Sequence, residues 1–221
     1  MTLTFTPFGL NAVTGRTGST ANAQVNTYAI AAAQRGTSFY ENMPVNIAGA
    51  ADEISGKNSI TVSSQQGVML GVFVGVEYTN TNGEVVIDNK WIAGTPVKLG
   101  TSVLAKVYDN PEQEYDILCA AGNSTMDVPV AGSIAAAQVG LNATFGVLIG
   151  NGNNSTGKSY AFLSTNNAGG ADNIGVSQDF PLNILSLSDT PDYTGNAFGV
   201  NYNIARVRLN NTVYRAGTAG Q

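Results

Sequence analysis

The chain has 221 residues, of which 43% are hydrophobic and only 11% are charged, and its formal net charge is −5. This length can bury a hydrophobic core, either as one large β domain or as two small ones. The sequence contains no histidine, so it lacks the commonest general base and the commonest transition-metal ligand, and its ten basic residues form no patch of the kind that binds a phosphate backbone.

Residues 1–23 are rich in polar residues and glycine, with isolated Phe5, Phe8 and Leu10 among them. Pro7 breaks any regular element here, and a free disordered tail seldom carries two phenylalanines. The segment is therefore predicted to be an extended arm that docks either on its own domain or on a neighbour. It lacks the basic and apolar regions of a signal peptide, and no run in the chain is long and apolar enough for a membrane span. We expect no membrane partner.

Residues 68–78 and 84–87 predict a β-hairpin. The first segment alternates, with one face formed by Val68, Leu70, Val72, Val74, Val76 and Tyr78. The opposite face contains Gly71 and Gly75, which leave room for a second backbone to approach closely. Asn82-Gly83 lies between the two segments and favours a type I′ turn, in which both central residues have positive φ.

The other elements are also mostly extended. Residues 28–33 fit a strand or one helical turn, and 103–120 fit a second hairpin that turns at Asp109-Asn-Pro111. The one helix expected covers 133–139, with Ser133 as its cap. A phase shift in the last strand, 200–209, predicts a bulge near Ala205-Arg206. Further strands are expected at 60–62, 96–99, 145–149, 159–163 and 180–187.

These patterns predict an all-β protein. We expect an antiparallel β-barrel or sandwich with an extended N-terminal arm at 1–23 and at most one or two short helices. The body is assigned to residues 24–221, with a candidate boundary near residue 121. The sequence leaves a single barrel, a sandwich and two small barrels open.

Gly152-Asn-Asn-Ser-Thr-Gly-Lys-Ser159 fits the phosphate-binding loop of nucleotide-binding proteins. In such a loop Lys158 would neutralise phosphate charge and Ser159 would hold Mg²⁺, and a helix must follow. Here Tyr160 and Phe162 follow in alternation, as in a strand, and no apolar strand ending in Asp lies downstream. A hairpin loop is therefore the favoured interpretation, with nucleotide binding as the alternative.

Other residues with chemical potential are sparse. Glu112, Glu114 and Asp116 alternate along one strand, and a carboxylate pair can hydrolyse glycosides only at a set separation in a cleft. Trp91 and Tyr193 are candidates for stacking on a sugar, although core packing is the commoner role of such residues. Cys119 is the only cysteine and is expected to be a small buried residue. We expect no catalytic residue, no cofactor and no metal.

Several segments together resemble a known family. They are residues 5–10, 71–78 with Asn82-Gly83 and Trp91, 105–111, 184–187, 190–192, 195–197 and 200–215. In this order they resemble small structural proteins of tailed bacteriophages, which are encoded near the major capsid protein and are identified as capsid decoration, or cement, proteins. The resemblance covers most of the chain in patches, and residues 121–180 match poorly.

The resemblance implies a non-enzymatic virion protein that binds the outer surface of the capsid and bridges capsomers. The partners it implies are the major capsid protein and further copies of the chain, as a homotrimer. It places the protein on the capsid exterior after synthesis in the bacterial cytoplasm. Phe5, Phe8 and Leu10 are then the expected contacts with a neighbouring subunit or the capsid. The alternatives are a carbohydrate-binding β-sandwich module of a capsid or fibre surface and an enzyme.

Overall fold

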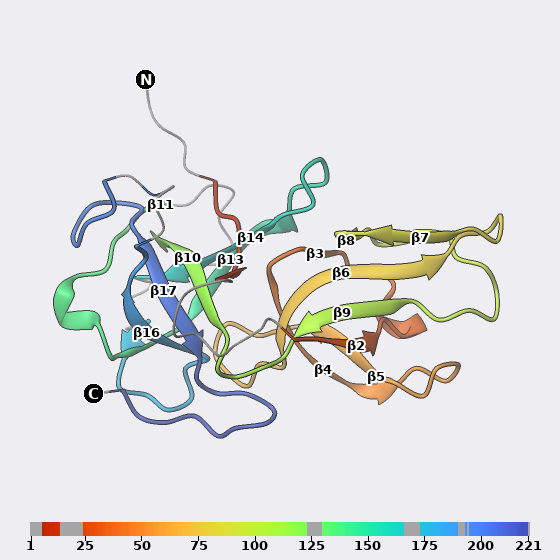
Figure 1. Ribbon diagram of the computed structural model, residues 1–221, viewed down its shortest axis with the longest axis horizontal. Coiled ribbons are helices and arrows are strands. Elements are labelled where there is room, and N and C mark those ends of the chain that lie inside the picture. The colour runs from red at the N-terminus through yellow and green to blue at the C-terminus, as the bar shows by residue number, and fades with distance from the viewer. Residues whose placement is uncertain are drawn as a thin grey trace.

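The computed structural model describes residues 6–13, 24–122, 130–165, 173–189, 193 and 195–220. They form two β lobes that lie side by side (Figure 1) and are joined by residues 109–113. Helical structure in these residues is confined to two single 3-10 turns, η1 (Ala32–Gln34) and η2 (Ala136–Gln138). The all-β prediction is confirmed.

The first lobe is a small closed sheet. Its strands are β2 (Val25–Ala29), β4 (Met43–Ala51), β5 (Asn58–Val62), β6 (Gly71–Thr79) and β9 (Leu104–Tyr108). They run in the order β4-β5-β2-β9-β6, and β6 pairs back with β4 to close the sheet. The edge strand β7 (Val85–Asp88) pairs with the far half of β6, while β3 (Phe39–Tyr40) and β8 (Lys90–Trp91) form a separate ladder. Fully buried Phe39, Phe73 and Trp91 are among the side chains that fill the lobe.

The second lobe contains the rest of the strands. They are β1 (Asn11–Ala12), β10 (Glu114–Ala121), β11 (Val130–Ala131), β12 (Asn142–Ala143), β13 (Phe145–Gly152), β14 (Ser159–Ser164), β15 (Ile174–Gly175), β16 (Leu182–Leu187) and β17 (Ile204–Leu209). The order is β13-β14-β10-β17-β16-β12-β15, and β1 and β11 also pair with β10. β12 and β13 lie near opposite ends of this strand order, but only Thr144 separates them in the chain. The two ends of the sheet therefore lie close together, and the sheet curls around its own core.

The hairpin of β6 and β7 is confirmed, but its turn differs from the prediction. The amide of Gly83 donates to the carbonyl of Asn80 at 3.0 Å, and only Gly83, not Asn82, has a positive φ (90°). The side chain of Asn80 accepts hydrogen bonds from the amides of Asn82 and Glu84 at 2.9 and 3.0 Å. This arrangement is a three-residue loop that ends in a left-handed glycine, and the Asn80 side chain stabilises it in place of a type I′ turn.

The alternation predicted for β6 does not persist along the strand. The register with β9 shifts between Phe73 and Gly75, so a bulge at Val74 places Phe73 and Val76 in the same core. The prediction for the glycines is confirmed. A Cβ on Gly71 would lie 2.1 Å from the carbonyl oxygen of Tyr108, and one on Gly75 would lie 2.8 Å from a backbone oxygen of β7.

The second predicted hairpin, 103–120, is wrong. Strand β9 pairs with β2 and β6 in the first lobe, and β10 pairs with strands of the second lobe. Buried Asp109 fixes the chain between them, because its carboxylate accepts hydrogen bonds from Asn26 (2.8 Å) and the hydroxyl of Tyr28 (2.6 Å). Alternation predicted the two strands correctly but carried no information about their partners. The change of sheet at 109–113 lies earlier in the chain than the boundary considered near residue 121.

Two local predictions in the second lobe also need correction. The last strand begins at Ile204 and not at residue 200, because a turn with Tyr202 at φ 61° precedes it. The bulge lies on the partner strand: Leu185 in β16 is the extra residue between pairs that face Val207 and Arg206. The helix expected at 133–139 is only the single turn η2, and its N-cap residue is Ala135 and not Ser133.

Candidate interaction surface

The N-terminal arm docks on the chain's own body at the junction of the two lobes. The amide of Gly9 donates to Ala161 in the second lobe at 3.1 Å, and the amide of Leu10 donates to Asn42 in the first lobe at 2.9 Å. Leu10 is fully buried in the core of the second lobe. Of the two docking alternatives, residues 6–13 therefore show the intramolecular one.

The docking of the arm on its own body limits which of the three predicted contact residues can reach a partner. Leu10 has no exposed side chain to offer a capsid or a neighbouring subunit, because its own core encloses it. Phe8 is half-buried, and its ring stacks on that of Tyr193 at a centroid distance of 6.2 Å. Phe5 lies outside the described residues. An intermolecular contact stays a prediction for Phe5 and Phe8.

The phosphate-loop motif forms a hairpin loop between β13 and β14. Ser159 begins a strand and not a helix, so the amide cradle and helix dipole of a phosphate site do not form. The ammonium of Lys158 lies 2.6 Å from the carboxylate of Glu41 in the first lobe. The main chain of Glu41 also bonds to both sides of Lys158: its amide donates to Gly157 at 2.8 Å, and its carbonyl accepts from Ser159 at 2.9 Å.

Neighbouring contacts show that this hairpin loop holds the lobes together. The hydroxyl of Tyr40 donates to the side chain of Asn154 at 2.7 Å, and the side chain of Asn89 donates to the carbonyl of Thr156 at 3.1 Å. Gly157 has a φ of 73°, and a Cβ there would lie 2.2 Å from Asn89. The glycine and the lysine of the motif thus have structural roles in an interlobe clamp.

The alternating carboxylates and arginines are paired with one another. Arg206 is buried, and its Nε lies 3.0 Å from the carboxylate of Asp116 on the adjacent strand. Burial alone lowers the pKa of Arg206, but the hydrogen bond and charge of Asp116 outweigh it and raise the pKa. Arg208 and Arg215 both pair with Glu112. The basic residues of this region therefore neutralise the carboxylates that were candidates for catalysis.

Trp91 and Cys119 are core residues. Trp91 is 1% exposed, donates from Nε1 to the carbonyl of Arg35 at 3.3 Å, and packs edge-on against Tyr78. It has no free face for a sugar, so of the two aromatic candidates only Tyr193, which is half-exposed, has accessible surface. Cys119 is fully buried, as predicted, and burial raises the pKa of its thiol.

The described part of the chain offers neither a cluster of metal ligands nor a helix that could span a membrane. No group of three or more His, Cys, Asp or Glu side chains there is arranged to hold a metal ion. Among the same residues, no helix has the length and apolar character that crossing a membrane requires.

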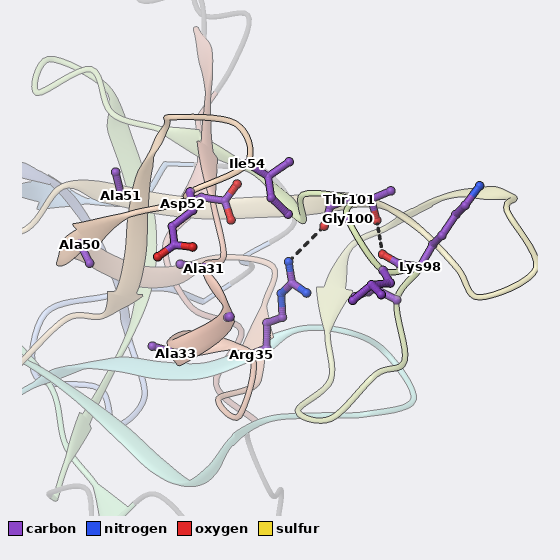
Figure 2. Close-up of a pocket in the computed structure, with 14 residues that line it drawn as sticks. Ala31, Ala33, Arg35, Ala50, Ala51, Asp52, Ile54, Lys98, Gly100 and Thr101 are labelled. Carbon is purple, nitrogen blue, oxygen red and sulfur yellow. Dashed lines mark hydrogen bonds between the residues drawn. The ribbon is translucent and has the colours of Figure 1, made fainter.

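A pocket lies at the end of the first lobe away from the second lobe. Its volume is about 470 Å³. Three segments form it: η1 with its flanks, the turn between β4 and β5, and the loop that precedes β9 (Figure 2). The lining is largely apolar and includes Ala32, Ala50, Ile54, Val97 and Leu99. Small alanine side chains from two segments leave the space that the pocket occupies.

Hydrogen bonds tie the walls of this pocket to one another. The carboxylate of Asp52 accepts from the amide and hydroxyl of Ser55 (2.9 and 2.7 Å) and from the hydroxyl of Ser102 (2.7 Å). The guanidinium of Arg35 donates to the carbonyl of Thr101 at 3.2 Å. Burial by itself raises the pKa of Asp52, but the bonds from Ser102 and Ser55 and the charge of Arg35 outweigh it and hold the pKa below its ordinary value. The pocket is therefore preformed.

The same end of the molecule carries the three most exposed large apolar side chains of the described residues, Leu99, Ile87 and Val85, together with Ile54. The exposed fractions are 99% for Leu99, 79% for Ile87, 67% for Val85 and 55% for Ile54. We call these four residues the distal apolar end. Single exposed apolar residues are ordinary on a protein surface, but several gathered on one end mark an interaction site. No local pattern in the sequence reveals this surface. Only the fold brings the β4–β5 turn to the loop before β9, and joins that loop to the end of β6 through the Lys98–Thr79 hydrogen bond (2.9 Å).

Comparison with known proteins assigns no family to the chain. No protein-family model, no curated protein and no solved structure matches it. The function of the chain must therefore be inferred from its own residues and from the distal apolar end.

Proposed function

We propose that this protein is a non-enzymatic structural protein of a tailed bacteriophage, which binds the outer surface of the capsid lattice and stabilises it by bridging capsomers. Its partners would be the major capsid protein and further copies of itself. We propose a homotrimer by analogy with other decoration proteins. The protein would act in the virion, on the capsid exterior.

The observation that carries the proposal is the β7 part of the distal apolar end, formed by Val85 and Ile87. Ile87 and Val85 alternate on β7, an edge strand whose only ladder among the described residues is with β6. Bare apolar side chains beside an unpaired strand edge are unfavourable in water, and proteins usually cover or charge such edges. With 11% charged residues the surface as a whole is weakly solvated. A large protein lattice is a partner that would cover this end.

The interlobe clamp supports the same proposal. Lys158, the arm around Leu10 and the Asp109 hydrogen bonds make one rigid two-lobed body from two small cores. A rigid body can bind two capsomers at once without losing conformational entropy on binding. Binding only to the assembled lattice then shifts the equilibrium away from disassembly, and many copies on one shell act together.

A sedimentation assay tests the proposal. Purified protein is mixed with undecorated shells assembled from the major capsid protein of the same phage, and the shells are pelleted. We expect wild-type protein to pellet with the shells to saturation. Ile87→Asp should weaken binding about tenfold or more, because it places a charge in a covered apolar contact.

Val176→Asp is the matched control. Val176 is 62% exposed, so the variant makes the same chemical change on the second lobe, away from the distal apolar end. It should bind like wild type. Wild-type protein that stays in the supernatant at micromolar concentration would overturn the proposed function. Equal binding by Ile87→Asp and wild type would remove β7 as the contact.

A further inference from the structure

We infer that the pocket of Figure 2 receives Leu99 from a second copy of this chain, so that two copies pair about a two-fold axis. Capsid binding and this pairing are separate properties, because the pairing needs only the purified protein. The proposed shell contact is at Ile87 and Val85 on β7, whereas the pairing surface is the pocket and its two rims.

The surface offers both a projecting side chain and a hollow. Leu99 is 99% exposed although it stands on the rim of an apolar pocket, so its side chain points out of its own pocket and not into it. The volume of about 470 Å³ is ample for a leucine side chain together with part of its loop. Because both features lie on one face, a two-fold rotation places each Leu99 over the pocket of the other copy. Removing both leucines from water favours the pairing.

Charge complementarity supports a second copy as the occupant. Lys98 precedes Leu99 in one wall of the pocket, and Glu53 precedes Ile54 in another. Both charged side chains are exposed, and neither forms an ion pair with another described residue. The two-fold rotation brings the Lys98 rim of one copy over the Glu53 rim of the other. Two equivalent Lys98–Glu53 pairs then flank the buried leucines and fix the register.

Hydrogen bonds also order the walls of the pocket before a partner binds. The Asp52–Ser102 hydrogen bond ties one rim to the other, and Arg35 ties η1 to Thr101. A partner therefore meets walls that are already ordered, which lowers the entropic cost of association. A small apolar molecule could fill the hollow, but it would leave the rim leucine exposed and the two rim charges unused.

Analytical ultracentrifugation over a range of protein concentrations tests the inference. At high concentration the wild-type protein should reach twice the mass of Leu99→Asp, whatever smaller unit that variant forms. The substitution should raise the dissociation constant of the pair about a hundredfold, since it buries a charge without a partner. Because Leu99 is fully exposed within its own chain, the variant should keep the wild-type circular dichroism and melting temperature. Equal masses at every concentration would overturn the inference.

Charge reversal tests the geometry independently. Lys98→Glu and Glu53→Lys should each weaken pairing about tenfold, because each creates two like-charge contacts, and the double variant should recover most of the wild-type affinity. A double variant as weak as the singles would overturn the two-fold arrangement. Stabilisation by a small amphipathic compound such as octanoate, with wild-type and Leu99→Asp masses equal, would identify a small-molecule site instead.

Discussion

Replacement of Leu10 by alanine should destabilise the protein strongly, because Leu10 belongs to the core of its own chain. Its side chain is fully buried in the core of the second lobe, to which Tyr115 and Phe145 also belong. Hydrogen bonds from Leu10 to Asn42 and from the preceding Gly9 to Ala161 hold the main chain in place. The site therefore has little freedom to collapse around a smaller residue.

The expected magnitude follows from this burial. Leu10→Ala removes three carbon atoms from the core, which costs about 2.4 kcal/mol in transfer free energy at about 0.8 kcal/mol each. A cavity that collapses only partly adds to this, so the free energy of unfolding should fall by about 3–4 kcal/mol. For a chain of this size each kcal/mol lowers the melting temperature by about 2–4 °C, so Tm should fall by about 10 °C.

Calorimetry and urea unfolding followed by circular dichroism measure both quantities. Phe8→Ala is the matched control, because Phe8 lies in the same arm but is half-buried and stacks on Tyr193. It should cost about 1 kcal/mol. A loss below about 0.5 kcal/mol for Leu10→Ala would refute the reasoning and would show that the arm docks elsewhere.

Three further predictions concern the clamp, the pocket and the close backbone approach. Lys158→Ala should lower the free energy of unfolding by about 0.5–1 kcal/mol, since the ion pair with Glu41 is partly exposed. Calorimetric titration should detect ATP binding neither in wild type nor in the variant. Saturable, Mg²⁺-dependent binding by wild type would contradict the clamp role. Asp52 has a lowered pKa, so its ionised form stabilises the fold above about pH 4, and this contribution disappears as the pH falls through the lowered pKa. Asp52→Asn should therefore be about 1–2 kcal/mol less stable at pH 7, and urea titrations should show the gap closing below about pH 4; a gap independent of pH would be the contrary result. Gly71→Ala should cost about 3 kcal/mol or prevent folding, because its Cβ would lie 2.1 Å from the carbonyl of Tyr108, whereas Gly49→Ala, which meets nothing within 4 Å, should have wild-type stability.

Features set by neighbouring residues could be predicted from the sequence. Alternation located β6 and β7, Asn82-Gly83 located the hairpin between them, and Gly71 marked the close approach of two backbones. The strand alternation after Ser159 was enough to separate a hairpin loop from a phosphate-binding loop.

Features that depend on distant residues could not be predicted. β9 and β10 are neighbours in the chain, but β9 pairs with β2 and β10 pairs with β17. Both partners lie far away in the sequence. The predicted type I′ turn does not form, because the Asn80 side chain stabilises a longer loop. The pocket combines segments around Ala32, Ile54 and Leu99, and no local pattern links them.

The proposed capsid binding is tested most directly by cryo-electron microscopy of the phage shell assembled with and without this protein. The account predicts a layer of two-lobed density on the outer surface that is present only when the protein is added, with the end that carries Ile87 against the shell. Identical maps for the two shells, or density inside the shell, would contradict it.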